Sequence, residues 1–68
     1  MSSIAKIIEM SADSEKSFDD ALQVGIIQAK ETLRHVRSVW IKDQEVLLEG
    51  GNPKVYRAHL KVTFMLER

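Results

Sequence analysis

The sequence predicts an α+β fold, in which one helix packs on a three-stranded antiparallel sheet and the elements follow the order β-α-β-β. Residues 55–66 alternate between apolar even positions and mostly polar odd positions, the pattern of a half-buried strand. Residues 18–36 carry apolar side chains at spacings of three, four and seven, which is typical of one face of an amphipathic helix. Residues 49–54 contain two glycines, an asparagine and a proline, which predicts a tight turn between two strands.

The first strand is expected over residues 4–11, a stretch rich in β-branched and apolar side chains. Residues 11–17 are polar and predict a break in the chain. Ser14 could cap the helix that follows, or Ser17 could, because Asp20 lies three residues later in a pair that resembles a capping box.

The helix is expected to begin at Phe18, with an apolar face that continues to Val36. Acidic side chains occupy its first turn, and Arg34, His35 and Arg37 form a cationic cluster at its end. This order of charges suits the helix dipole. The alternative role for the cluster is a phosphate site for a nucleotide-like cofactor.

The second strand is expected over residues 37–49, and the third over residues 55–66. One helix can cover only one face of their sheet. The opposite face should display Trp40 among polar side chains, and a large exposed aromatic usually marks an interface or a ligand shelf. No partner for His59 or Lys61 is evident in the sequence. The side chains expected beside Trp40 are Ser38, Lys42, Arg57, His59, Lys61, Thr63 and Met65.

The length of 68 residues predicts a single domain, residues 1–68, with a thin core. Domains of about 60 residues bury only about 60% of their unfolded surface and need a further source of stability. The absence of cysteine excludes disulfides, and the two histidines lie far apart without carboxylates at metal-ligand spacing. Oligomerisation is therefore the expected source.

Charge and hydropathy exclude several classes of function. Ten basic and ten acidic residues balance to zero, so nucleic-acid binding is not expected. No apolar run approaches the roughly 20 residues of a membrane span, and no signal peptide is visible, so we expect a soluble cytoplasmic protein. No nucleophile is paired with a base at a recognisable spacing, so we do not expect an enzyme.

Three stretches carry a resemblance to a known family: SIAKIIEMSADSEKSF, ALQVGIIQAKETLRHVRSVWIKDQ and VYRAHLKVTFMLE. With them the sequence resembles the dodecins over nearly its whole length. The resemblance implies a β-α-β-β subunit and a hollow homododecamer as the assembly. It also implies a small-molecule ligand, since most known dodecins bind riboflavin or FMN as stacked pairs between subunits.

The family's flavin contacts are replaced in this sequence. Ser38 stands where flavin-binding members have a stacking tryptophan, and Trp40 lies two residues later, about 6.6 Å along the strand at about 3.3 Å per residue. Arg57 stands at the position of the flavin-contacting glutamine. Glu45 and Met65 stand where some members have arginines that support flavin or its phosphate. The resemblance therefore implies weak or lost flavin binding.

A second branch of the family, the calcium dodecins, resembles this sequence more closely at these positions. Its members also lack the tryptophan at Ser38 and carry a Tyr–Arg pair, here Tyr56 and Arg57. They share the glutamine that corresponds to Gln44 and an acidic residue at Glu45. Calcium is thus a second candidate ligand.

Two interpretations remain open for each candidate residue. Trp40 is a ligand shelf or a structural anchor packed between subunits. Arg57 binds a flavin edge or an anion, or it pairs with a carboxylate such as Glu45 of a neighbouring subunit. Asp43, Glu45 and Glu49 offer oxygen ligands to calcium, or they form a solvated strand edge.

The sequence leaves three hypotheses for function: a flavin-storing cage, a cage that binds calcium or another small ligand, and a purely structural particle. The candidate binding residues are Ser38, Trp40, Gln44, Glu45, Arg57 and Met65.

Overall fold

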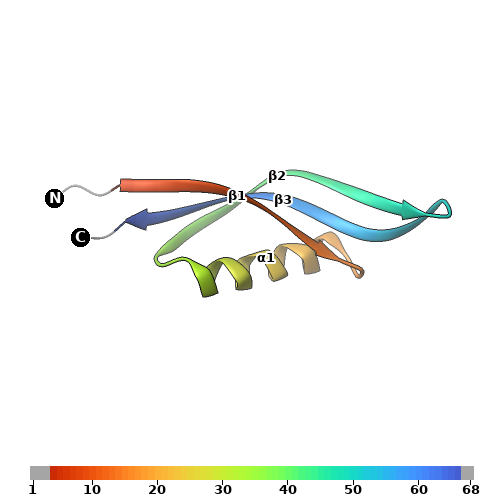
Figure 1. The fold of residues 1–68 in the computed structure, drawn as a ribbon, viewed down its shortest axis with the longest axis horizontal. Helices are drawn as coiled ribbons and strands as arrows, with labels where there is room; N and C mark the ends of the chain where they lie inside the picture. The colour runs from red at the N-terminus through yellow and green to blue at the C-terminus, as the bar shows by residue number, and fades with distance from the viewer. Residues whose placement is uncertain (1–3, 67–68) are drawn as a thin grey trace.

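A computed structural model describes residues 4–66 and confirms the predicted fold; the ends of the expected domain, 1–3 and 67–68, lie outside the described residues. The three strands form one antiparallel sheet in the order β1-β3-β2, and the helix lies along one face of it (Figure 1). In chain order the elements are β1 (Ile4–Ser14), α1 (Phe18–Thr32), β2 (Val36–Glu49) and β3 (Asn52–Leu66).

The central strand β3 has the two faces that its alternation predicts. Ala58, Leu60 and Val62 are each at most 1% exposed and lie beneath the helix. The odd-numbered side chains between them are only partly buried and point to the other face. The alternation therefore fixes which side of the sheet receives α1.

The strand β1 is longer than expected, because it continues through the polar stretch as far as Ser14. Ala12 and Ser14 pair with β3 and are buried on the helix side, so ladder pairing and burial outweigh the polar composition. The break follows Ser14, whose hydroxyl donates to Asp20 Oδ2 at 2.6 Å and accepts the backbone N–H of Lys16 at 2.9 Å.

The helix begins as expected but ends earlier. Ser17 is the N-cap, and its hydroxyl accepts the backbone N–H of Asp20 at 3.0 Å. The helix ends at Thr32, and the expectation that its face continues to Val36 is wrong, because Val36 pairs with Phe64 in the sheet. The chain reverses at His35, whose φ is +58°.

The cationic cluster does not occupy the last turn of the helix. Arg34 and His35 lie in the connection after α1, and Arg37 lies on β2. Lys30 is the basic residue of the last turn. Compensation of the helix dipole therefore rests on Lys30, and the cluster needs a different explanation.

The turn between β2 and β3 is shorter than the predicted one. It consists of Gly50 and Gly51, with φ values of +60° and +82°, and Glu49 pairs with Asn52 on either side of it. Two-residue hairpin turns of this kind require positive φ at both positions, which glycine adopts without steric cost.

The core consists mainly of small side chains that bring the helix close to the sheet. Ala12, Ala21, Ala58 and Leu60 form its buried cluster. A Cβ at Gly25 would lie 2.5 Å from Leu60 Cδ1 and 3.3 Å from Ala12 Cβ, so glycine sets the closest approach of α1.

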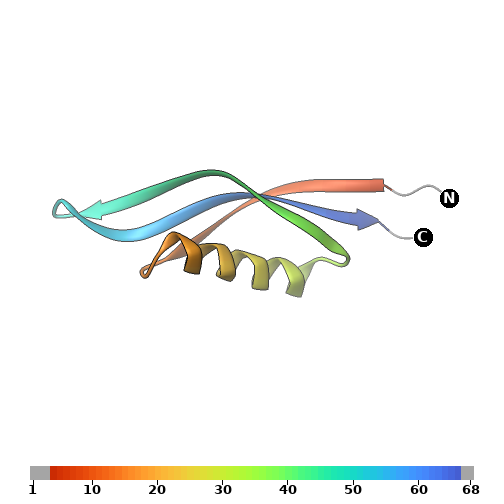
Figure 2. The ribbon, with the colours of Figure 1, turned by 180° about the vertical axis from the view of Figure 1, so that it is seen from behind.

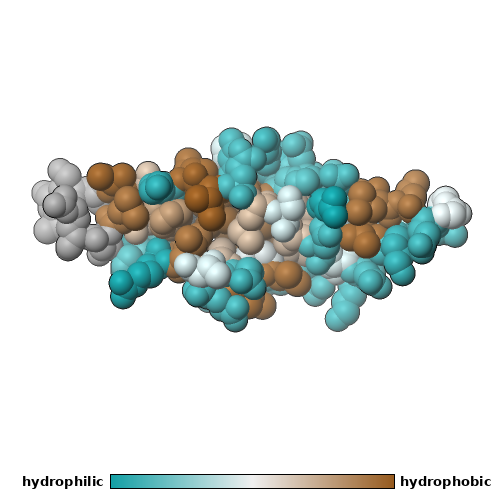
Figure 3. Space-filling view, in the orientation of Figure 1, coloured by the Kyte–Doolittle hydropathy of each residue, from teal (hydrophilic) through white to brown (hydrophobic). Residues whose placement is uncertain are grey.

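Both ends of the sheet extend beyond the helix, and they carry exposed apolar side chains. The molecule measures 54 × 18 × 14 Å, with the hairpin at one end and the start of β1 at the other (Figures 1 and 2). Hydrophobic side chains gather toward both ends (Figure 3). Ile4 and Ile7 lie at one end and Leu48 at the other, each more than half exposed. Within residues 4–66, no helix is long and apolar enough to cross a membrane.

We predict that Gly25→Ala lowers the free energy of unfolding by about 1 kcal/mol. Alanine gains about 0.5–1 kcal/mol over glycine within a helix, but overpacking a core costs about 1–3 kcal/mol. Urea unfolding at a fixed protein concentration measures the difference. Adding Leu60→Val makes room beside the new methyl group, so the double variant should be more stable than the sum of the two single effects. A stabilised Gly25→Ala variant would show that the close approach is not restrictive.

Candidate functional site

The sheet face turned away from α1, which we call the open face, carries four rows of side chains with one residue from each strand. Both β1 and β3 contribute odd-numbered residues to it, because their even-numbered residues face the helix. From the start of β1 toward the hairpin, in the order β1, β3, β2, the rows are Ile7–Thr63–Ser38, Glu9–Lys61–Trp40, Ser11–His59–Asp43 and Asp13–Arg57–Glu45.

The register of β2 decides which predicted binding residues reach the open face. An irregularity between Ile41 and Asp43 shifts the pairing by one residue, as a β-bulge does. Gln44 consequently pairs with Ala58, which is buried beneath the helix, so Gln44 belongs to the helix side of the sheet. The residues that the structure places on the open face are Ser38, Trp40, Glu45, Arg57 and Met65.

These five residues do not form one cluster. Ser38 and Trp40 occupy neighbouring rows, whereas Glu45 and Arg57 share a row nearer the hairpin. Met65 lies at the far end of β3. The open face therefore contains a section around Trp40 and a separate charged section around Arg57.

Trp40 is 65% exposed, so most of its ring system contacts solvent. The ammonium of Lys61, its cross-strand neighbour, lies over the ring at 5.2 Å from the centroid. This is a cation–π contact, so Lys61 has a partner that sequence reasoning missed. Beside it, Lys42 Nζ lies 3.2 Å from Glu9 Oε1, which joins β2 to β1.

His59 links all three strands through its ring nitrogens. Its Nδ1 lies 2.7 Å from the hydroxyl of Ser11 on β1, and its Nε2 lies 2.6 Å from Glu45 Oε2 on β2. The sequence shows no evident partner for His59, and the structure gives it two within the chain. Glu45 is engaged by His59 of its own chain, because the shifted register brings these two side chains within reach of each other.

Arg57 forms a two-bond fork with Asp13 of the same chain. Its Nε donates to Asp13 Oδ1 at 2.8 Å and its Nη2 to Asp13 Oδ2 at 2.9 Å. The hydrogen bond from Arg57 lowers the pKa of Asp13, and the bond to Asp13 raises the pKa of Arg57. Within the chain this fork is possible because β1 extends to Ser14 and places Asp13 opposite Arg57. A pair between Arg57 and a carboxylate such as Glu45 of a neighbouring subunit stays a prediction.

The acidic residues suggested for calcium do not form a site within the described chain. Asp43 and Glu45 both belong to the open face, and Glu49 lies beside the hairpin turn. Among residues 4–66, no group of three histidine, aspartate or glutamate side chains is placed to hold a metal ion. Calcium binding therefore stays a prediction.

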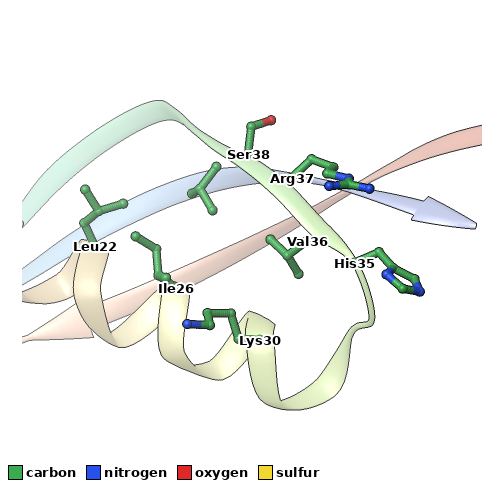
Figure 4. A pocket seen from close by; sticks show the side chains of 8 residues that line it. Leu22, Ile26, Lys30, His35, Val36, Arg37 and Ser38 are labelled. Atoms are coloured by element: carbon green, nitrogen blue, oxygen red, sulfur yellow. The ribbon is translucent and has the colours of Figure 1, made fainter.

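A groove of about 590 Å³ lies on the helix side, between α1 and the first part of β2 (Figure 4). Its apolar walls come from both elements, Lys30 and Arg37 bring cationic groups to it, and His35 brings an imidazole. Arg34 lines a neighbouring pocket at the helix end. The apolar wall residues are Leu22, Ile26, Val36 and Val39.

Sequence reasoning missed Glu9, Ser11 and Asp13, which contribute the β1 column of the open face. The signal was present, because the alternation of β1 continues through Ala12 to Ser14. The signal was overlooked because the polar composition of residues 11–17 was interpreted as a break in the chain. The odd positions of a longer first strand would have placed all three opposite β3.

Asp13→Asn should lower the thermal stability at neutral pH, because it removes an ionic acceptor from the Arg57 fork. The pKa of folded Asp13 lies below the ordinary value of 3.8, so this stabilisation is complete above that value and is lost as the pH falls through the lowered pKa. The difference in Tm between wild type and variant should stay constant from neutral pH to about 5 and shrink below 3.8. Asp43→Asn, the same charge change on the open face, is the control; an identical pH profile for both variants would contradict the assignment.

Comparison with known proteins places this fold in a family. Residues 4–67 match the dodecin family. A dodecin of Thermus thermophilus is 30% identical over 67 residues, which cover 98% of this chain and 97% of the relative. The crystal structure of an arginine-to-alanine mutant of a T. thermophilus dodecin superposes with a TM-score of 0.92 at 28% identity and covers 98% of this chain and all of its own.

The calcium dodecin of Mycobacterium tuberculosis, described as a calcium-chelating antigen with a novel calcium-binding site, has the same fold. Its TM-score is 0.83 at 20% identity, over 94% of this chain and 91% of its own. Dodecins are binding proteins without enzymatic activity, which confirms the expectation that the chain is not an enzyme. Since the match spans nearly all of the sequence and the fold is the same, this chain belongs to the dodecin family.

Proposed function

We propose that this chain is the subunit of a hollow homododecamer whose open face binds a planar aromatic ligand by stacking on Trp40, with flavin bound only weakly. Family membership supports the assembly, because dodecins are small ligand-binding dodecamers. The single observation that carries the ligand class is the ring of Trp40, which is 65% exposed on the open face.

The distribution of apolar surface also supports assembly. The largest side chains buried within the single chain are Leu60 and Val62. Ile4, Ile7 and Leu48 are each more than half exposed at the two ends of the sheet. Contiguous exposed apolar surface usually marks an interface, and a chain of this size needs further burial to be stable. Neighbouring copies supply that burial in the proposed cage.

Flavin fits this open face only in part. Trp40 offers a stacking surface for the ring system, but Ser38 has no ring at the family's stacking position. Arg57 cannot freely replace the glutamine that contacts the flavin edge, because Asp13 holds its guanidinium in a fork. Glu45 has a carboxylate where some members have a supporting arginine, and that carboxylate is bound to His59.

These losses set the expected affinity. A nanomolar site requires about 12 kcal/mol of binding free energy, and each 1.4 kcal/mol lost weakens binding tenfold. A stacked aromatic pair contributes about 0.5–1.5 kcal/mol beyond the burial of its surface. Stacking on Trp40 without the edge contacts is therefore expected to give micromolar or weaker binding of riboflavin.

Titration with riboflavin tests the stacking site, since Trp40 is the only tryptophan of the chain. We expect saturable mutual quenching of tryptophan and flavin fluorescence with a micromolar Kd, and Trp40→Leu should abolish the quenching of the flavin. N-acetyltryptophanamide is the control for collisional quenching. Nanomolar binding would contradict the weak site, and flat traces up to high micromolar flavin would contradict stacking.

Native mass spectrometry of Trp40→Leu tests the alternative role of Trp40 as a structural anchor. Loss of the dodecamer in this variant would assign Trp40 to assembly.

Leu48→Asp should prevent or weaken assembly, because it places a charge on an apolar side chain that is 63% exposed near the hairpin. Native mass spectrometry should show smaller species at concentrations where the wild type is a dodecamer. Lys54→Asp, on the other strand of the same hairpin, is the control and should assemble. A dodecamer of unchanged stability for Leu48→Asp would show that the hairpin end is not in an interface.

A further inference from the structure

The section of the open face around Trp40 has a positive charge that its neighbours do not neutralise. Each of the other cations on this face has a carboxylate within the chain: Arg57 has Asp13, and Lys42 has Glu9. Lys61 has an aromatic ring instead. Its ammonium forms no ion pair with a carboxylate anywhere in residues 4–66.

The carboxylates near Lys61 are engaged or displaced. Glu9 is its direct cross-strand neighbour on β1, but Glu9 Oε1 lies 3.2 Å from the ammonium of Lys42. The row of Trp40 and its immediate surroundings thus hold two ammonium groups and one carboxylate, and that carboxylate is paired with Lys42. The next carboxylate, Asp43, lies one row nearer the hairpin, opposite His59.

We propose that the ligand of this face is a planar aromatic ring that carries an anionic group, and that Lys61 is the residue that selects the charged form. The inference rests on the proposed stacking site at Trp40. A ligand that stacks on the indole meets the ammonium of Lys61, which lies over the same ring at 5.2 Å from its centroid. An anionic group on the ligand forms an ion pair with the ammonium, which replaces the cation–π contact that the ligand disrupts. A neutral ring disrupts the cation–π contact and offers the ammonium no ion pair in its place.

The position of Lys61 makes it suited to this role. The residue is only partly exposed and sits on the central strand, so its stem is held beside the indole by strands on both sides. The cation–π contact keeps the ammonium near the ring before a ligand arrives, which reduces the ordering that binding requires. Lysine presents a compact point charge, so it selects for charge and leaves the shape of the anionic group open.

FMN and riboflavin form a matched pair of probes, because they differ only in one phosphate. We expect FMN to bind the wild type about fivefold more tightly than riboflavin at low ionic strength, as measured by mutual quenching with Trp40. The ratio should approach one at 0.5 M salt, where exposed charges are screened. Lys61→Met should bring the ratio to about one at low salt, and Lys61→Arg should retain the preference.

Lys54→Met, which removes the same charge from β3 near the hairpin, is the control and should keep the wild-type ratio. Asp43→Asn should raise the preference for FMN, because it removes the carboxylate of the next row, which forms no ion pair within residues 4–66. Failure of both flavins to quench Trp40 would overturn the stacking site itself. Equal binding of the two flavins, or a preference that survives in Lys61→Met, would overturn the role of Lys61 and leave stacking intact. Circular dichroism and native mass spectrometry confirm that each variant folds and assembles.

Discussion

The helix is much shorter than the sheet on which it packs, and this difference in length determines which parts of the sheet stay exposed. An α-helix of 15 residues is about 22 Å long, whereas a strand of 15 residues spans about 50 Å. The helix can therefore bury only the middle of β3, where Ala58, Leu60 and Val62 lie. The ends of the sheet and its second face are left for other contacts. The exposed apolar ends arise from this difference in length, and the open face around Trp40 arises because a single helix covers only one face of the sheet.

The thinness of the core follows from the same arrangement. The helix packs mainly against β1 and β3 and diverges from β2, which leaves the groove lined by Leu22 and Val39. Where the helix does touch the sheet, Gly25 and the alanines bring the two backbones close together. Few large side chains are buried within one chain, so the fold is suited to gain its remaining burial between copies.

Local patterns in the sequence were sufficient to predict the fold. They were not sufficient to predict which side chains pair with one another on the open face. Alternation in β3, the cap at Ser17 and the two glycines of the hairpin are local signals, and each was predicted close to its place. The helix end was missed, because the apolar spacing runs on into a strand. The position of Gln44 and the partner of Arg57 depend on strand register and on a bulge, which pair residues far apart in the sequence.

The bulge in β2 also sets the chemical character of the open face. Without the extra residue at Lys42, each later residue of β2 would slide by one position against β3, and Gln44 would stand opposite Arg57 in place of Glu45. The hydrogen bonds of His59 to Ser11 and to Glu45, which lies one row nearer the hairpin, form just beyond the bulge and fasten β2 to the other two strands. A shift of register would thus exchange a carboxylate for an amide on this surface without any mutation, so the position of the bulge decides, as much as the identity of the side chains does, which groups the open face presents.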